Sequence, residues 1–302
     1  MGVDLINPYR NQQGRWIRGS FHGHCTENSR CSSVPLSESV RRYSELEVGF
    51  VTLTDHDVVT DLSQMRERYP DQIFLEGFEY SSRENVIFVG AQVGPLYELS
   101  LEEALTRAGD ILTVVCHPRP HADGRDYWTL PMLEALGTRP DGIEVYNGHY
   151  GIETAIANGR WPLYTRFWDE LLTANYRVWG YANDDFHDPD DFGNAFNMVL
   201  VDDESPQAIV TAAKAGRCYA STGLLLKTLA EERGDIVVEL DAVCAGAFIG
   251  PGGEELAKSE GTRFEYRASG EAYVRFEAEG ETGRIFLQPM WDGRPTVDLT
   301  RR

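Results

Sequence analysis

The first two-thirds of the chain alternates short apolar runs with amphipathic segments. The apolar runs have the length of buried strands, and they occupy residues 15–22, 50–53, 73–75, 111–116, 142–146, 177–181 and 195–201. Segment 35–46 lies between two of them, and its apolar residues Leu36, Val40, Tyr43 and Leu46 recur at helical spacing. Regular alternation of strand and helix predicts parallel strands joined by crossover helices, and hence an α/β barrel or open sheet.

Two helix starts are marked by capping residues. Ser100 is followed by Glu103 at the third helical position, as in a capping box. Ser205 precedes Pro206, and proline is favoured at the first position of a helix. We therefore expect helices to begin directly after Ser100 and Ser205.

The pattern changes after Gly223. Apolar and polar residues then alternate with a period near two over residues 235–240, 263–268, 272–278 and 284–288, and glycine-rich turns separate these stretches. This pattern is typical of antiparallel strands. We expect residues 1–223 to form one α/β unit and residues 224–302 a small antiparallel, β-sandwich-like domain docked on it.

Composition narrows the choice of partner and compartment. The 302 residues are 42% hydrophobic and 25% charged, which is normal for a folded protein with a core. A net charge of −20 argues against a nucleic-acid backbone or an anionic membrane as the main partner, but a small phosphorylated molecule still fits where metals or arginines reverse the local charge. The five cysteines form no Cys-x-x-Cys pair, and no apolar stretch has the length of a signal peptide or membrane span. We therefore expect a reduced, cytoplasmic protein.

Five of the seven histidines stand at or just after the end of a predicted strand. Parallel α/β folds build their sites at that edge. In Phe21-His22-Gly23-His24 the two histidines point to the same side of an extended chain, so both rings can reach one metal ion. A His-x-His pair alone is nevertheless a weak signal.

Histidines and carboxylates recur at the ends of the other predicted strands: Asp55 with His56, Glu79, His117, Glu144, and Asp185 with His187. Taken singly, each is explained as a hydrogen-bonded or ion-paired core residue. Their recurrence at successive strand ends favours a metal site instead. A carboxylate such as Glu79 can bridge two cations, and imidazole combined with carboxylate suits zinc, manganese or iron.

The motifs His-x-His, Thr-Asp-His, Gly-x-Glu, His-Pro, Glu-x-x-Asn and Asp-x-His, in this order over about residues 16–222, resemble those of the PHP (polymerase and histidinol phosphatase) superfamily. Residues 216–223 and the β-rich tail are similar to stand-alone phosphoesterases of that superfamily with an appended C-terminal β domain. The resemblance implies a distorted (β/α)7 barrel with two or three divalent metal ions. It assigns one complete site to His22, His24, Glu79 and Asp185. By the same resemblance Glu79 bridges to a second metal at His117, and His56 with His187 holds a third.

The chain departs from the superfamily's pattern at two places. The first motif usually continues with Ser-Asp or Ser-His, and the expected ligand here falls on Ser29, with Glu27 as an alternative. Members often have a histidine shortly after Gly-x-Glu, but residues 85–90 of this chain contain none. One predicted site is therefore complete, and two are one ligand short.

These residues predict a metal-dependent phosphoesterase that hydrolyses a small phosphate monoester, cyclic ester or diester with metal-activated water. Arg119 is the candidate phosphate ligand, since a guanidinium fork matches a phosphate. His121 and Asp55 are candidates for proton transfer. Cys25 and Cys116 are expected to be packing residues.

Other functions stay open at this point. The same hydroxide can attack a carbonyl, which would make the chain a hydrolase of a non-phosphate bond. The C-terminal domain and the two incomplete sites are also compatible with a ligand-binding module of low turnover. DNA processing is the weaker alternative, because the chain lacks blocks of basic residues.

Overall fold

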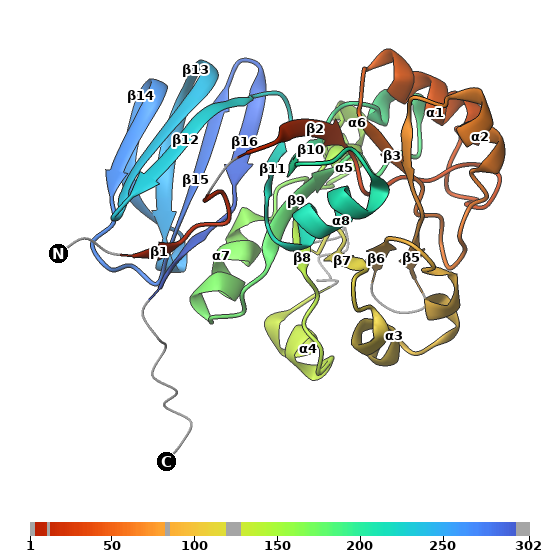
Figure 1. Ribbon diagram of the computed structural model, residues 1–302, viewed down its shortest axis with the longest axis horizontal. Helices are drawn as coiled ribbons and strands as arrows, with labels where there is room; N and C mark the ends of the chain where they lie inside the picture. The colour runs from red at the N-terminus through yellow and green to blue at the C-terminus, as the bar shows by residue number, and fades with distance from the viewer. Residues whose placement is uncertain (1–3, 11–12, 82–84, 119–127, 294–302) are drawn as a thin grey trace.

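The computed structural model describes residues 4–10, 13–81, 85–118 and 128–293. Figure 1 shows an α/β part on the right and a layer of antiparallel strands on the left. The strands of the α/β part are β2 (Arg15–Gly19), β3 (Phe50–Thr52), β4 (Ile73–Leu75), β5 (Gly77–Tyr80), β6 (Val86–Val89), β7 (Leu112–Val115), β8 (Gly142–Asn147), β9 (Trp179–Asn183), β10 (Phe196–Val201) and β11 (Cys218–Ser221). Its helices are α1 (Leu36–Glu45), α2 (Ser63–Arg68), α3 (Leu101–Arg107), α4 (Leu130–Ala135), α5 (Gly148–Gly151), α6 (Glu153–Ala157), α7 (Thr165–Thr173) and α8 (Pro206–Lys214), with 3-10 turns η1 (Gly94–Glu98) and η2 (Pro189–Asp191).

Most strands of the α/β part run parallel, in two groups. β2, β3 and β4 pair in one sheet, and β7, β8 and β9 pair in the other. Two isolated bridges join the groups beyond the strand ends, one between Gly23 and Phe186 and one between His56 and Glu79. The mixed α/β architecture that we expected is confirmed. The bridges place the segment after β2 beside the segment after β9, and the segment after β3 beside β5.

Two strands do not follow the expected parallel order. β6 is antiparallel to β5 and β7, and β10 is antiparallel to β2 and β11. A parallel return needs a crossover, usually a helix. The few residues between β5 and β6 leave no room for one, and the segment between β9 and β10 contains only the 3-10 turn η2. The expectation of parallel strands was therefore wrong for β10, and β6 was not among the predicted strands.

The capping signals work as predicted. The Ser100 side chain accepts a hydrogen bond from the backbone N–H of Glu103 at the start of α3. Ser205 does the same for Ala208 at the start of α8, with Pro206 at the first helical position. Both helices therefore satisfy one of their free N-terminal donors from within their own sequence.

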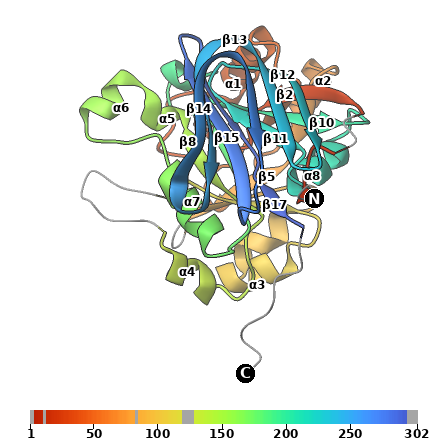
Figure 2. The ribbon, with the colours of Figure 1, turned by 90° about the vertical axis from the view of Figure 1, so that its left-hand side faces the viewer.

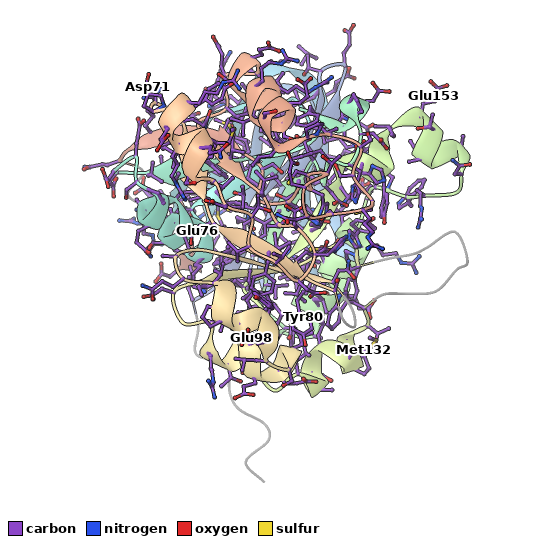
Figure 3. All side chains as sticks on the ribbon, turned by 90° about the vertical axis from the view of Figure 1, so that its right-hand side faces the viewer. Asp71, Glu76, Tyr80, Glu98, Met132 and Glu153 are labelled. Atoms are coloured by element: carbon purple, nitrogen blue, oxygen red, sulfur yellow. The ribbon has the colours of Figure 1, made fainter. Side chains whose placement is uncertain are left out.

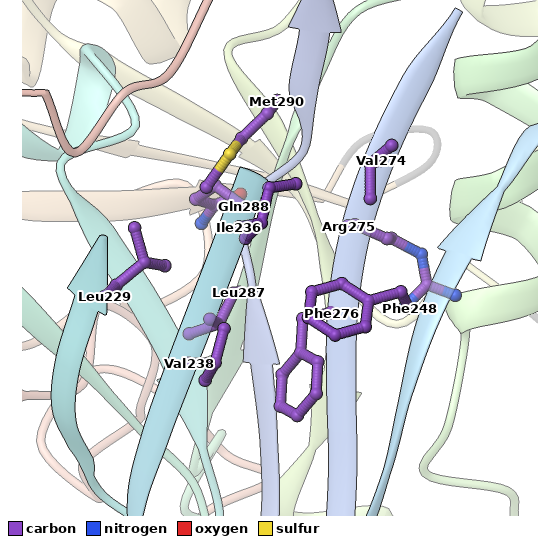
Figure 4. A pocket seen from close by; sticks show the side chains of 10 residues that line it. All are labelled: Leu229, Ile236, Val238, Phe248, Val274, Arg275, Phe276, Leu287, Gln288 and Met290. Carbon is purple, nitrogen blue, oxygen red and sulfur yellow. The ribbon is translucent and has the colours of Figure 1, made fainter. Parts of the chain in front are cut away.

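The C-terminal part is built from antiparallel strands, seen edge-on in Figure 2. They are β12 (Leu226–Glu232), β13 (Asp235–Gly250), β14 (Glu254–Arg267), β15 (Tyr273–Gly280), β16 (Gly283–Leu287) and β17 (Met290–Asp292), with the 3-10 turn η3 (Pro251–Gly253) between β13 and β14. Val238, Phe248, Phe264 and Phe276 belong to its buried apolar cluster. Figure 4 shows a pocket lined in part by Val238, Phe248 and Phe276, whose cavity of about 10 Å³ has room for roughly one water molecule. This core therefore has no space for an organic ligand at that pocket.

The two parts share one sheet. β16 pairs with β11 of the α/β part, and the short β1 (Leu5–Ile6) pairs with β17. A division of the chain between residues 223 and 224 stays a prediction, because strands before and after this point are hydrogen-bonded to one another in one sheet.

Figure 3 views the molecule from the side that carries α1, α2 and α3, and it labels the exposed acidic residues Asp71, Glu98 and, on α6, Glu153. Each described helix is too short or too polar to span a lipid bilayer.

Candidate metal centre

The seven predicted metal ligands come together at the ends of the parallel strands. His22 and His24 follow β2, His56 follows β3, and Glu79 lies on β5; the others follow β7 and β9, and they are His117, Asp185 and His187. His22, His24, Glu79 and Asp185 are almost completely buried. Because several chain segments contribute, the cluster forms only when the strands have assembled.

Local backbone features direct the ligands inward. A Cβ atom on Gly23 would lie 2.0 Å from the Phe186 ring, so only glycine fits between the two histidines of His-x-His. His117 and Asp185 both have a positive φ, 25° and 48°. Such values are uncommon outside glycine and are concentrated at functional sites.

Four potential ligand atoms lie close together at the centre of the cluster. Asp185 Oδ1 lies 3.2 Å from the Nε2 atoms of both His22 and His24, and these two nitrogens are 3.2 Å apart. Glu79 Oε2 lies 3.4 Å from His22 Nε2 and 3.3 Å from His24 Nε2. Ligands bound at about 2.0–2.1 Å to a tetrahedral metal ion lie roughly 3.3 Å from one another. The separations among His22, His24 and Asp185 therefore match three ligands of a tetrahedral ion, and Glu79 Oε2 lies at ligand spacing from both histidines.

Glu79 spans the cluster. Its Oε1 accepts a hydrogen bond of 2.6 Å from Asn85 Nδ2 and lies 3.4 Å from His117 Nε2, while its Oε2 lies 3.0 Å from His56 Nδ1. Oε2 is buried and has no well-aligned hydrogen-bond donor among the described residues. An unsatisfied buried carboxylate oxygen is costly, and a bound cation would remove that cost.

The charges of the cluster also suit a cation. Burial alone would raise the pKa of Glu79, but His22, His117 and His56 hold it well below its usual range. Burial lowers the pKa of His24 to about 4, so this imidazole is neutral near pH 7, as a metal ligand must be. Burial opposes a charge on His22 as well, yet Asp185, Cys116 and Glu79 raise its pKa well above normal. The cluster therefore attracts positive charge at His22.

A second layer of side chains fixes the ligands. Glu144 Oε1 lies 2.8 Å from His22 Nδ1 and accepts from Asn183, and its Oε2 accepts from the backbone N–H of His117 and from Asn147. Asn147 also donates to Asp185 Oδ2 at 3.0 Å. A carboxylate at Nδ1 leaves His22 Nε2 free to bind a metal. The Glu-x-x-Asn motif thus orients ligands.

Asp55 lies behind the centre, on the far side of His24. Its carboxylate accepts hydrogen bonds from Cys25, Thr60 and Ser29, the last at 2.6 Å. Ser29, where the superfamily's ligand was expected, lies 3.4 Å from His24 Nδ1. Ser29, held by Asp55, can therefore orient the His24 ring. Proton transfer by Asp55 stays a prediction. The other two predicted catalytic residues, Arg119 and His121, lie outside the described residues.

Two residues at the rim were missed by sequence reasoning. His149 Nδ1 lies 2.9 Å from Asp191 Oδ2, and its ring lies 4.6 Å from that of His187. Cys31 is an exposed cysteine beside His56 and His187. Burial alone would raise the pKa of its thiol, but these two histidines lower it to about 6. The one signal available was spacing, since His149 stands two residues after Asn147 and Cys31 two residues after Ser29.

No protein-family model and no curated protein matches the chain. Among solved structures, it is similar to a two-domain protein from Bacteroides vulgatus ATCC 8482 that contains a predicted PHP-like metal-dependent phosphoesterase. The two sequences are 16% identical, the match covers 95% of this chain and 98% of that chain, and the TM-score is 0.52. A second structure, an amidohydrolase from Chromobacterium violaceum with bound sulfate and no metal, is 15% identical, with a TM-score of 0.37 over 56% of this chain and 87% of that chain. The resemblance predicted from the motifs is confirmed at the level of the fold by the first of these structures.

Proposed function

We propose that this chain is a metal-dependent hydrolase whose substrates are small phosphate esters. The observation that carries the proposal is a set of buried atoms at ligand spacing: Asp185 Oδ1 and the Nε2 atoms of His22 and His24 lie 3.2 Å from one another, and Glu79 Oε2 lies within 3.4 Å of both nitrogens. Glu79 reaches further towards His56 and His117, which supports two or three divalent ions, with manganese, zinc or iron as candidates. The distorted (β/α)7 barrel belongs to the same proposal, and the two bridges between the strand groups support it.

Divalent metals bound at such a centre supply a hydroxide nucleophile near neutral pH and positive charge for the phosphoryl oxygens. The residues of the chain orient the metal ligands and supply the proton for the leaving group. Glu144 and Asn147 hold His22 and Asp185 in place. His149 is the candidate proton donor to the leaving group: its Nδ1 faces Asp191, so Nε2 is the nitrogen that can carry and release a proton.

An anionic substrate needs positive charge near this site. Arg119 stays our candidate for that role. The Arg160 guanidinium, 5.1 Å from the Tyr150 ring, adds positive charge on the same rim, because Tyr150 lies 5.5 Å from His117. The net charge of −20 favours a small molecule over a nucleic acid as the phosphorylated partner.

Turnover assays on the metal-loaded protein test the proposal. Phosphomonoesters, cyclic phosphates, phosphodiesters, lactones and amides should be screened with manganese, zinc and iron. We expect hydrolysis of at least one class of phosphate ester. Hydrolysis confined to lactones or amides would contradict the substrate class, and tight metal binding without any turnover would favour a ligand-binding module.

A further inference from the structure

Cys31 differs from the other four cysteines of the chain. Cys25, Cys116, Cys218 and Cys244 are buried, whereas Cys31 is exposed. Its thiol lies within hydrogen-bonding reach of His56 and His187. These two histidines are the ones that the superfamily resemblance left one ligand short.

The geometry around Cys31 is that of a ligand set. Potential ligand atoms of Cys31, His24 and His56 all lie within 4.8 Å of one another. The His24 ring stands between the other two rings, 4.5 Å from that of His56 and 4.5 Å from that of His187. Three imidazoles and one sulfur thus meet at the rim of the centre.

An independent observation points to a cation at the same place. Glu79 Oε2, on a side chain that is 1% exposed, lies 3.0 Å from His56 Nδ1, and neither atom has a well-aligned hydrogen-bond partner among the described residues. A carboxylate oxygen and a histidine nitrogen therefore face each other without satisfying each other. A metal ion bound beside them would use both.

We propose that Cys31 is a thiolate ligand which, with His56 and His187, binds the third metal ion of the centre, at its rim. Cys31 thereby supplies the ligand missing at Ser29, whose hydroxyl is engaged by Asp55. Sulfur is a soft donor, so this position should select zinc, iron or cobalt over magnesium. The inference rests on the proposed function, because it adds a ligand to the same centre.

Cobalt(II) and zinc(II) are the probes. A thiolate bound to cobalt(II) adds a charge-transfer absorption in the near ultraviolet, which nitrogen and oxygen ligands lack. We expect this band in the cobalt-loaded wild-type chain and its loss in Cys31→Ser, together with about one equivalent of bound metal. Cys31→Asp should regain the metal without the band. Cys244→Ser, which alters a buried cysteine in the C-terminal sheet, is the matched control and should keep both.

Thiol labelling of the unmodified chain gives a second readout that needs no variant. Without metal, Cys31 should react first with an alkylating reagent, and zinc should slow that reaction by more than about tenfold, because a coordinated sulfur is no longer a free nucleophile. Cobalt binding without the band, or equal labelling with and without zinc, would overturn the role of Cys31 alone. A chain that binds neither metal would overturn the proposed function as well.

Discussion

Charged side chains are buried at two places in this molecule, and they are satisfied in different ways. At the junction of α7 and β15, Asp169 accepts two hydrogen bonds from Arg275, at 2.6 and 2.7 Å, and a third from Tyr273. The Arg275 guanidinium, 1% exposed, also donates to Glu277. This pair is complete within the protein, and it links the two parts of the chain.

At the metal centre the buried carboxylates face imidazoles instead. Glu79 and Asp185 have no lysine or arginine partner among the described ion pairs, and Glu79 Oε2 has no well-aligned donor there. Burial of charge alone therefore does not mark a functional site. The distinguishing feature is a set of buried polar atoms that the protein leaves unsatisfied and holds at the spacing of ligands.

The largest effect on metal binding and turnover is expected at Asp185. Asp185→Asn replaces a negative ligand with a neutral amide, so we expect loss of bound metal and a fall in kcat of about 10³-fold or more. The unfolding free energy of the metal-free protein should change little, because the amide keeps the size of the side chain, and the lost attraction to His22 is offset by removal of a buried negative charge. Elemental analysis, kinetics and denaturant titration measure these effects.

Asp190→Asn, the same substitution at an exposed position nearby, is the control and should leave all three quantities unchanged. A wild-type rate for Asp185→Asn would remove Asp185 from the set of ligands.

The junction should respond in the opposite way. Arg275→Met leaves Asp169 buried without its cation, which typically costs about 3–5 kcal/mol in the free energy of unfolding. Metal content and the kcat of the folded protein should be unchanged. Arg263→Met, which removes an exposed arginine of β14 that pairs with Glu239 and Glu265 at the surface, is the matched control and should alter stability little. Equal losses in the two variants would show that the buried pair has no special structural role.

Asp191 combines features of both places, because one of its carboxylate oxygens is satisfied within the protein and the other is not. Its Oδ2 accepts from the backbone N–H groups of His187 and Asp188 and pairs with His149, while its buried Oδ1 has no hydrogen-bond partner among the described residues. If Asp191 serves chemistry by orienting His149, His149→Phe should slow hydrolysis of alkyl phosphates by about 10²-fold.

Nitrophenyl phosphates provide the internal control, because their leaving group needs no proton. Their rate should change little in His149→Phe. Equal slowing of both substrates would assign His149 to metal or substrate binding instead of proton donation.

Sequence reasoning found residues that follow strands and missed those placed by loops. His22 and His24 were visible because the two-residue repeat of an extended chain and Gly23 put both rings on one side. Glu79, His117 and Asp185 each follow or lie within an apolar run, so topology alone predicts that they meet. The structure brings them together, and their role as ligands stays a prediction.

Cys31 and Asp191 escaped notice because neither stands directly after an apolar run. His149 does stand just after β8, so the signal that marked the other strand ends could have found it. The proximity of these residues depends on how the loops after β2, β8 and β9 fold over one another, which local patterns do not encode. The antiparallel direction of β10 was missed for a similar reason. Its apolar run is the same for either direction, and the absence of a crossover helix decides between them.

The pairing of β1 with β17 also determines when this part of the sheet can form during translation. Leu5 and Ile6 are synthesised about 285 residues before their partners, Asp292 and Trp291. The hydrogen bonds of Tyr9 also form late, since its buried hydroxyl donates to the backbone carbonyl of Cys218 and accepts from the backbone N–H of Gln288. During translation the N-terminal segment therefore remains an unpaired edge that can bind other chains. The strands of the metal centre lie between these ends, so the nascent centre can assemble before the sheet beside it is complete.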